Sequence, residues 1–260
     1  MIGDRVEVAP SDETWTIESV GPRKTTLIRR GRDGRKPKLV AANLDRVFVV
    51  VSLAEPRASH ELIDRLLVLV ESSGMRPVLV TNKVDLVSEP GVAAELSQVY
   101  VDIGYRVLPV SARSGEGLET LRADLCAGTS ALIGPSGVGK SSLMNALDPS
   151  LALRTGELSG KSGTGRHTTS SSRLIALECG GFVADTPGFG DIGLWGVPAE
   201  DLAACFPELA GIDPCRFRGC SHIQEPDCGV RAAVEAGQIR ESRYRSYLKL
   251  YGEAVAAAER

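Results

Sequence analysis

The hydrophobic positions divide the chain into a β-rich start, a long stretch of alternating strands and helices, and a helical end. Short runs of β-branched and aromatic residues, separated by turn residues, predict about three strands in residues 1–42. The apolar run at 46–53 is continuous, as is typical of a strand buried on both faces of a parallel sheet. Further strands are predicted at 77–83, 105–112 and 130–135, and helices at 61–72, 92–103, 116–125 and 140–147. This alternation predicts an α/β fold whose mainly parallel sheet is covered on both faces.

The remaining segments complete the predicted architecture. Residues 173–179 and 181–188 predict a hairpin around Gly180 and Gly181. From about residue 201 the chain turns helical and cysteine-bearing, and it ends in a charged, amphipathic helix. We therefore expect three domains, which are a β domain at 1–42, an α/β domain at 43–200 and a helical domain at 201–260.

Composition narrows the class of protein. The 260 residues are 43% hydrophobic and 24% charged, which suits a globular protein with a core. No apolar run reaches the roughly 20 residues that span a bilayer, and the N-terminus lacks the features of a signal peptide. We expect a cytoplasmic protein with no membrane partner. Its six cysteines are then expected to be thiols or metal ligands before disulfides.

The charge is unevenly distributed. The net charge of −3 excludes a chain that is basic as a whole. Residues 23–38, however, are rich in Lys and Arg and contain one acid, Asp33. This run is either a solvated hairpin tip or a patch that contacts phosphates.

Residues 134–141 fit the phosphate-binding pattern G-x-x-x-x-G-K-[ST], between a predicted strand and a predicted helix. The glycines allow backbone N–H groups to turn towards phosphate oxygens, and the helix N-terminus adds its dipole. We expect Lys140 to contact the β- and γ-phosphates and the Ser141 hydroxyl to bind Mg²⁺. The predicted phosphate-binding residues are Gly134, Ser136, Gly137, Val138, Gly139, Lys140, Ser141 and Ser142.

A second motif, Asp185-Thr186-Pro187-Gly188, follows an apolar strand. An acid at the end of such a strand is placed to bind on the Mg²⁺ side of a nucleotide. The N–H of Gly188 can lie against a γ-phosphate and register its loss. Alone the tetrapeptide is an ordinary turn, but together with the upstream phosphate loop it predicts a switch.

Residues 81–85, Thr-Asn-Lys-Val-Asp, end a predicted strand and predict which nucleotide base the protein binds. The Asp85 carboxylate can accept two hydrogen bonds from guanine, and adenine lacks that donor pair. Asn82 and Lys83 would brace the loop and the base, with Thr81 before them. Ser111 and Ala112, after the next strand, would pack the other edge of the base. Asp85 thus speaks against the alternative of an ATPase.

The order of these motifs is unusual. The base motifs precede the phosphate loop, and the helix after Ser111 runs through residues 126–128 into the strand of that loop. A circular permutation of a GTPase domain accounts for this order. It also implies that the switch after Asp185 leads directly into the C-terminal region.

Residues 160–172 are polar and rich in Gly, Ser and Thr. Thr168 or Thr169 can donate a hydroxyl to Mg²⁺ and an N–H to the γ-phosphate. His167 is either a residue that orients water or a surface histidine. Phe189 follows Gly188 where many GTPases place a glutamine nearby, so we predict slow intrinsic hydrolysis that a partner accelerates.

Cys215, Cys220, His222 and Cys228 lie within fourteen residues. Three thiols and an imidazole suit a closed, structural Zn²⁺ site, and the alternative is a set of unrelated buried thiols. Because so small a segment has little core, the metal would hold it folded. The other cysteines, Cys126, Cys179 and Cys205, lie in apolar contexts and are expected to be core thiols.

These motifs together resemble the RsgA family, also called YjeQ, of ribosome small-subunit-dependent GTPases. The matching stretches cover nearly the whole chain and include AANLDRV (41–47), TNKVDL (81–86), GPSGVGKSSLMNAL (134–147), GRHTT (165–169), DTPGF (185–189) and CRFRGCSHIQEPDCGVRAAVEAG (215–237). The resemblance implies an N-terminal OB-fold, a permuted GTPase domain and a C-terminal zinc domain. It also places Thr168 and Thr169 in switch I and favours His167 as a catalytic residue.

The resemblance further implies a function. It implies a late assembly factor of the 30S ribosomal subunit that binds GTP with Mg²⁺, contacts 16S rRNA and leaves after hydrolysis. Separately, no apolar seam demands a dimer, so we expect a monomer. Contacts to rRNA would use the basic run at 23–38 and the C-terminal cations Arg231, Arg240, Arg243, Arg245 and Lys249. The alternative is an rRNA-binding module gated by GTP, in which hydrolysis is incidental. One departure is the short N-terminus, because a full OB-fold is a five-stranded barrel.

Overall fold

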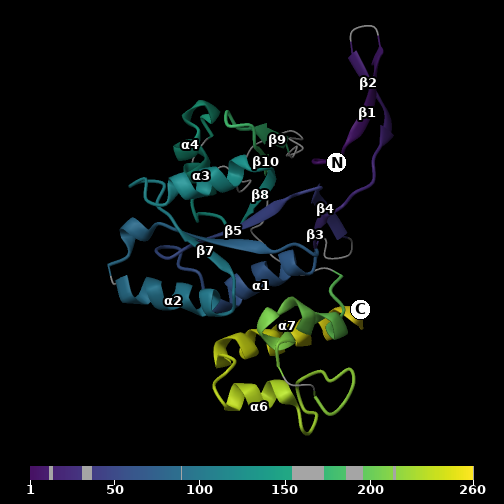
Figure 1. Ribbon diagram of the computed structural model, residues 1–260, viewed down its shortest axis with the longest axis vertical. Helices are drawn as coiled ribbons and strands as arrows, with labels where there is room; N and C mark the ends of the chain where they lie inside the picture. Colours follow the sequence, from purple (N-terminus) through teal and green to yellow (C-terminus); the bar gives the residue numbers. More distant parts are fainter. Residues whose placement is uncertain are drawn as a thin grey trace, which may run out of the picture.

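The computed structural model describes residues 1–11, 14–30, 37–88, 90–153, 173–185, 196–212 and 215–259 (Figure 1). At its centre is a six-stranded sheet with the order β7-β6-β5-β8-β10-β9. Neighbouring strands are parallel except β9 and β10, which form the predicted antiparallel hairpin. The strands are β5 (Arg46–Ser52), β6 (Pro77–Asn82), β7 (Arg106–Pro109), β8 (Thr129–Ile133), β9 (Arg173–Ala176) and β10 (Phe182–Asp185).

Each face of this sheet has its own core, which explains the continuous apolar run of β5. Successive side chains of a strand point to opposite faces, so Val49 and Val51 join one core while Phe48 and Val50 join the other. Figure 1 shows α1 and α2 on one side of the sheet and α3 and α4 on the other. The prediction of an α/β sheet covered on both faces is confirmed. These helices are α1 (His60–Glu71), α2 (Pro90–Asp102), α3 (Leu118–Cys126) and α4 (Lys140–Leu147).

The N-terminal region holds four strands where the sequence predicted about three. Among the described residues of this region they form two separate hairpins, β1–β2 and β3–β4. The strand missed by the sequence is β4, because its first residues, Pro37 and Lys38, read as a polar connector; proline is tolerated at the first position of a strand. The strands are β1 (Val6–Ser11), β2 (Thr14–Val20), β3 (Thr26–Arg30) and β4 (Pro37–Ala42).

The two hairpins differ in burial. Leu27 of β3 and Ala41 of β4 belong to the core under the sheet. The β1–β2 hairpin projects away from the rest of the chain (Figure 1), and Trp15 is 70% exposed. The second hairpin therefore shares a core with the α/β part, whereas the first is largely exposed.

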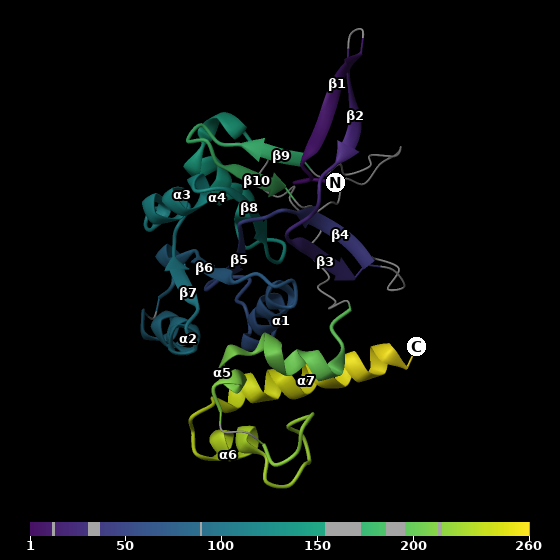
Figure 2. The same ribbon diagram turned by 45° about the vertical axis from the view of Figure 1, so that its right-hand side comes forward.

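The C-terminal region packs as a third core. Leu202, Phe206 and Tyr247 form its centre, and Val68 of α1 also belongs to it. The C-terminal elements thus lie against α1, as both views show (Figures 1 and 2). No helix in the described ranges is long and apolar enough to cross a membrane. The elements are the 3₁₀ helix η3 (Ala199–Cys205), α5 (Pro207–Ala210), α6 (Gly229–Glu235) and α7 (Glu241–Ala258).

One of the cations predicted to contact rRNA, Arg243, does not reach the surface, which corrects that part of the prediction. Arg243 is fully buried and binds Asp64 of α1 and Glu208 of α5. Three other cations form ion pairs, namely Arg240 with Asp102, Arg245 with Glu241, and Lys249 with Glu61. An amphipathic pattern alone did not distinguish a cation that faces solvent from one that joins two parts of the fold. Arg243 in particular is not available to a nucleic acid.

A disulfide joins Cys126 to Cys179. The prediction that both are core thiols was therefore wrong, whereas Cys205 is a buried free thiol as predicted. Cys126 ends α3 and Cys179 lies between β9 and β10, so the two meet only through the folding of the sheet. A separation of 53 residues concealed this proximity in the sequence.

Candidate nucleotide site and metal centre

The phosphate loop joins the end of β8 to the start of α4. Three of its glycines have positive φ, and two approach other chain segments closely. A Cβ on Gly134 would lie 2.0 Å from the Val50 carbonyl oxygen, and one on Gly139 would lie 2.4 Å from Asn82 Nδ2. Any side chain at these two positions would collide, so the loop requires glycine for its shape as well as for its inward N–H groups.

Lys140 and Ser141 open helix α4, and both are buried. Lys140 Nζ donates to the carbonyl oxygens of Gly134 at 2.8 Å and Pro135 at 2.7 Å. These bonds hold the ammonium group inside the curve of the loop, where a bound phosphate would be placed. Of the other predicted loop residues, Val138 is buried, Ser142 is half-buried, and Ser136 and Gly137 are exposed.

Asn82 connects the base motif to the phosphate loop. Its Nδ2 donates to the Val138 carbonyl oxygen at 2.8 Å, and its Oδ1 accepts from the Ala112 N–H at 3.4 Å. Thr81 precedes it at the end of β6 and is fully buried. Asn82 thus braces the loops at 111–112 and 134–139 against each other.

Asp85 and Ser111 form the second link. The Ser111 hydroxyl donates to Asp85 Oδ1 at 2.6 Å and accepts the backbone N–H groups of Arg113 and Ser114. Asp85 itself is exposed, so its carboxylate is oriented by one partner while remaining accessible. A fixed and accessible carboxylate is suited to accept two hydrogen bonds from a planar base.

The backbone of residues 53–58 also contributes to this site, which the sequence analysis did not predict. Lys83, at φ 65°, donates from Nζ to the Glu55 carbonyl oxygen at 2.6 Å. The Pro56 ring lies where it would meet a Cβ on Gly137 at 3.5 Å. The segment contributes the Glu55 carbonyl oxygen and the Pro56 ring. Neither contact corresponds to a sequence motif that could have predicted it.

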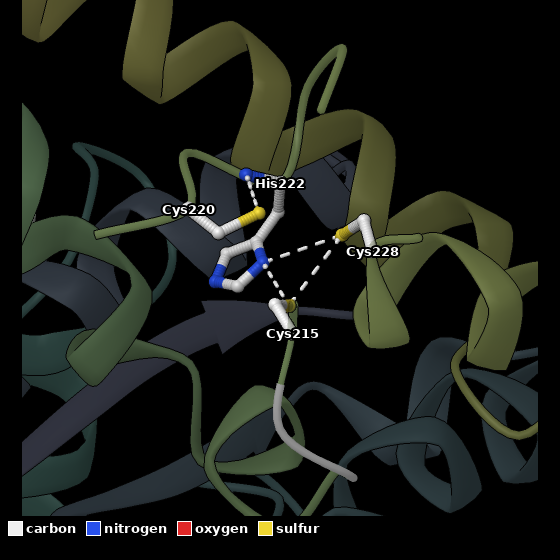
Figure 3. Close-up of side chains that lie close together, drawn as sticks. All are labelled: Cys215, Cys220, His222 and Cys228. Carbon is white, nitrogen blue, oxygen red and sulfur yellow. Dashed lines mark hydrogen bonds between the residues drawn. The ribbon is translucent and has the colours of Figure 1, made fainter. Parts of the chain in front are cut away.

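The four predicted metal ligands converge. The donor atoms of Cys215, Cys220, His222 and Cys228 all lie within 4.8 Å of one another (Figure 3). Cys215 Sγ lies 3.4 Å from His222 Nδ1 and 3.8 Å from Cys228 Sγ. Three sulfurs and one imidazole nitrogen at such separations fit a tetrahedral metal ion.

Neighbouring groups hold the loop that carries these ligands. The hydroxyls of Tyr244 and Tyr247, both on α7, donate to the carbonyl oxygens of His222 and Ser221 at 2.7 Å each. Burial lowers the pKa of His222, which favours the neutral imidazole that a metal needs.

Glu225 closes the same loop from within. Its carboxylate accepts the N–H of Ser221 at 2.7 Å and those of Ile223 and Gln224 at 3.2 Å. A hydrogen bond from the Ser221 side chain is the largest cause that lowers the pKa of Glu225 to about 2, and the Ser221 N–H is the next. The carboxylate is therefore ionised throughout the neutral range.

The sequence pattern of the RsgA GTPase family matches residues 20–195, which is most of the chain. The protein belongs to the RsgA GTPase family. It is 48% identical over 259 residues to the small ribosomal subunit biogenesis GTPase RsgA of Gemmatimonas aurantiaca, covering 98% of this chain and 84% of that protein. It is 45% identical to the protein of the same name from Moorella thermoacetica, again covering 98% and 84%.

Solved structures agree with this assignment. The crystal structure of YjeQ from Thermotoga maritima matches with a TM-score of 0.80 and 37% identity, over 97% of this chain and 84% of that one. The structure of YloQ, a circularly permuted GTPase, matches with a TM-score of 0.76 and 31% identity, over 98% and 80%. The predicted family and permuted GTPase fold are confirmed, and the protein is a GTPase.

Some predicted residues lie outside the described ranges. His167, Thr168, Thr169 and Gly188 are among them. Asp185 ends β10, which is paired with β8, so its backbone lies on the strand next to the one that leads into the phosphate loop. The roles predicted for His167, Thr168, Thr169, Gly188 and Asp185 therefore remain predictions.

Proposed function

We propose that this protein is a GTP-hydrolysing, late-stage assembly factor of the small (30S) ribosomal subunit, with a slow intrinsic activity that the subunit stimulates. The observation that carries the GTP assignment is the carboxylate of Asp85, oriented by Ser111 and braced by Asn82 against the phosphate loop. The ribosomal role rests on the relatives named above, whose names state small-subunit biogenesis.

In this proposal the nucleotide bridges the two sets of loops. Asp85 accepts from guanine N1–H and N2–H₂, and Ala112 packs the far edge of the base with Ser111. Residues 134–142 hold the phosphates through their N–H groups, and Lys140 leaves the loop carbonyls to contact the β- and γ-phosphates. Ser141, Thr169 and Asp185 are the proposed Mg²⁺ ligands. When bound, that ion neutralises charge on the transferring phosphoryl group.

Hydrolysis is assigned to the segments that follow. Thr168 and Thr169 would contact the γ-phosphate and its metal ion, His167 would orient the attacking water, and Gly188 would donate its N–H to the γ-phosphate. Phe189 has no group that can orient water, which supports a slow rate without a partner.

The remaining parts are proposed to bind and position the subunit. We infer a structural Zn²⁺ at Cys215, Cys220, His222 and Cys228, because a Cys₃His set with four converging donors leaves no open coordination position. The proposed domains are an OB-like β domain at 1–42, a permuted GTPase domain at 43–200 and a zinc domain at 201–260. Contacts to 16S rRNA would come from the basic run at 23–38 and the zinc domain, with the protein acting as a cytoplasmic monomer.

GTP turnover with purified small or large ribosomal subunits tests this function. Stimulation of at least tenfold by small subunits, and none by large subunits, is the expected result. An Asp85→Ala variant is the matched control, because it should lose both binding and stimulation. Equal turnover with and without subunits, while GTP still binds, would instead support the alternative of a GTP-gated rRNA-binding module.

A further inference from the structure

We propose that Cys126 and Cys179 form a reversible thiol–disulfide site that anchors the β9–β10 hairpin to helix α3. The bond joins the last residue of α3 to the turn between the two strands, at the end of β8 and β10 opposite the phosphate loop. Both views place α3 beside this hairpin (Figures 1 and 2). The nucleotide site does not use either cysteine.

The backbone around the two cysteines brings them together independently of the bond. The Phe182 N–H donates to the Gly128 carbonyl oxygen at 3.0 Å, which fixes the start of β10 beside the chain that leaves α3. Gly181 approaches so closely that a Cβ there would lie 2.2 Å from the Leu125 carbonyl oxygen. The Cα atoms of the two cysteines are 5.5 Å apart, within the usual span of a disulfide. The reduced thiols should therefore stay adjacent and able to pair again.

Accessibility separates Cys179 from the other cysteines. Cys179 is exposed and Cys126 is half-buried. Cys205, by contrast, is buried, and burial raises the pKa of its thiol to about 11. A small thiol or disulfide can thus reach the Cys179 sulfur, and exposed disulfides are the ones that exchange most readily.

The proposed co-reactant is a low-molecular-weight disulfide such as oxidised glutathione. The Cys179 thiolate attacks one of its sulfurs, which forms a mixed disulfide and releases one glutathione thiolate. The Cys126 thiolate then attacks the Cys179 sulfur, which forms the internal bond and releases the second. Two electrons pass from the protein thiols to glutathione, and the two protein thiols lose their protons. Reduced glutathione reverses both steps.

The disulfide is expected to restrict the motion of β9 more than that of the other strands. Within the described residues, β9 pairs only with β10 and lies at the edge of the sheet. Its four residues form a short ladder, so local opening of this hairpin should need little free energy. A covalent link at the turn limits this opening at the start of β10, the strand that ends at Asp185. Oxidation is therefore expected to rigidify the strand that leads into the proposed switch.

Redox titration of the full, zinc-loaded protein tests the site. The protein is equilibrated anaerobically across ratios of reduced to oxidised glutathione, quenched, and alkylated under denaturing conditions for peptide mass spectrometry. Cys126 and Cys179 should lose their alkylation together along one two-electron curve, while Cys205 stays alkylated. The Cys126→Ser variant should accumulate glutathione on Cys179, and a Cys205→Ser variant should titrate like the parent protein.

Hydrogen exchange tests the anchoring. Amides of residues 173–185 should exchange at least tenfold more slowly in the oxidised protein, and the Cys126→Ser/Cys179→Ser variant should show no dependence on redox conditions. Two thiols that persist at every glutathione ratio, or a disulfide that yields only after unfolding, would overturn the reversible site. Equal exchange in both redox states would overturn the anchoring. None of these readouts depends on GTP, so they stand apart from the proposed function.

Discussion

Replacing Arg243 by Met tests what holds the C-terminal helices against the GTPase part of the protein. Arg243 lies on α7, and its side chain is fully buried. Its guanidinium contacts Asp64 of α1 through Nη1, and Nε donates to Glu208 of α5 at 2.6 Å. The same group lies 4.6 Å from the centre of the Phe206 ring. One cation thus joins three elements that are distant in the sequence.

The expected loss of unfolding free energy follows from the carboxylates of Asp64 and Glu208, which the variant leaves without their cationic partner. Met occupies a similar volume, so the change removes charge and hydrogen bonds with little change in packing. Breaking a buried ion pair by removing one partner costs about 3–5 kcal/mol. Burial already raises the pKa of Asp64, so this carboxyl can take up a proton in the variant, which limits the loss. We therefore expect the free energy of unfolding to fall by about 4 kcal/mol. That is a large share of the roughly 5–15 kcal/mol that stabilises a typical domain.

Urea denaturation followed by circular dichroism measures this loss. The matched control is Arg245→Met, two residues along the same helix, because Arg245 and its partner Glu241 are exposed. That change should cost less than about 1 kcal/mol. Adding Asp64→Leu and Glu208→Met to Arg243→Met should restore most of the stability, since a well-packed apolar set can replace a buried ionic one. Equal losses in the Arg243 and Arg245 variants would refute the reasoning.

Three further predictions concern the nucleotide and metal sites. Asp85→Asn should weaken GTP binding by roughly a hundredfold, because hydrogen bonds to a charged acceptor contribute about 1.5–3 kcal/mol; an unchanged affinity in a fluorescent-nucleotide titration would contradict guanine recognition by Asp85. Cys215→Ala should abolish zinc retention and unfold the C-terminal region while GTP affinity stays within about twofold; metal content equal to that of the parent protein would exclude Cys215 as a ligand. Glu225 has a folded pKa of about 2 against an ordinary value of 4.5, so its stabilisation is complete above pH 4.5 and lost as the pH falls towards 2. Glu225→Gln should therefore lower the free energy of unfolding by about 1 kcal/mol at pH 7, measured by guanidinium denaturation. The difference from the parent protein should shrink below pH 4.5. A difference that does not depend on pH would show that the carboxylate charge is not the cause.

Local pattern was sufficient to predict the sheet and the loops that carry the chemistry. The apolar run of β5 and the glycines of the phosphate loop each reflect a constraint that one segment imposes on itself. The same holds for the metal ligands, because Cys215 and Cys228 are near neighbours in the chain. Their convergence within 4.8 Å required only a compact loop.

The features that the sequence did not reveal depend on partners far along the chain. Cys126 meets Cys179 only because β8 and β10 pair side by side. Arg243 is charged and sits on an amphipathic helix, so its sequence context resembles that of a solvent-facing cation; its burial follows from the carboxylates that α1 and α5 supply. A pattern read along one segment contains no information about such partners.

Helix α1 connects the nucleotide site to the region of the Cys₃His cluster, a link that the order of motifs does not suggest. It begins at His60, directly after the loop in which Glu55 accepts from Lys83. Along its length, Arg65 binds Glu253 of α7 through two hydrogen bonds of 2.5 and 2.6 Å. The region that carries the Cys₃His cluster is thus fixed to a helix that starts at the nucleotide site.

This arrangement changes how a signal from the nucleotide would reach the C-terminal region. The permutation alone indicates one route, through the chain that follows Asp185. The contacts of α1 supply a second, because a displacement of residues 53–58 must either be absorbed within that loop or move α1 together with α7. Buried contacts such as Val68 in the third core and Arg243 with Asp64 resist sliding between the two helices. Movement of α1 and α7 as one unit is therefore the less costly response, and it carries the Cys₃His cluster with it.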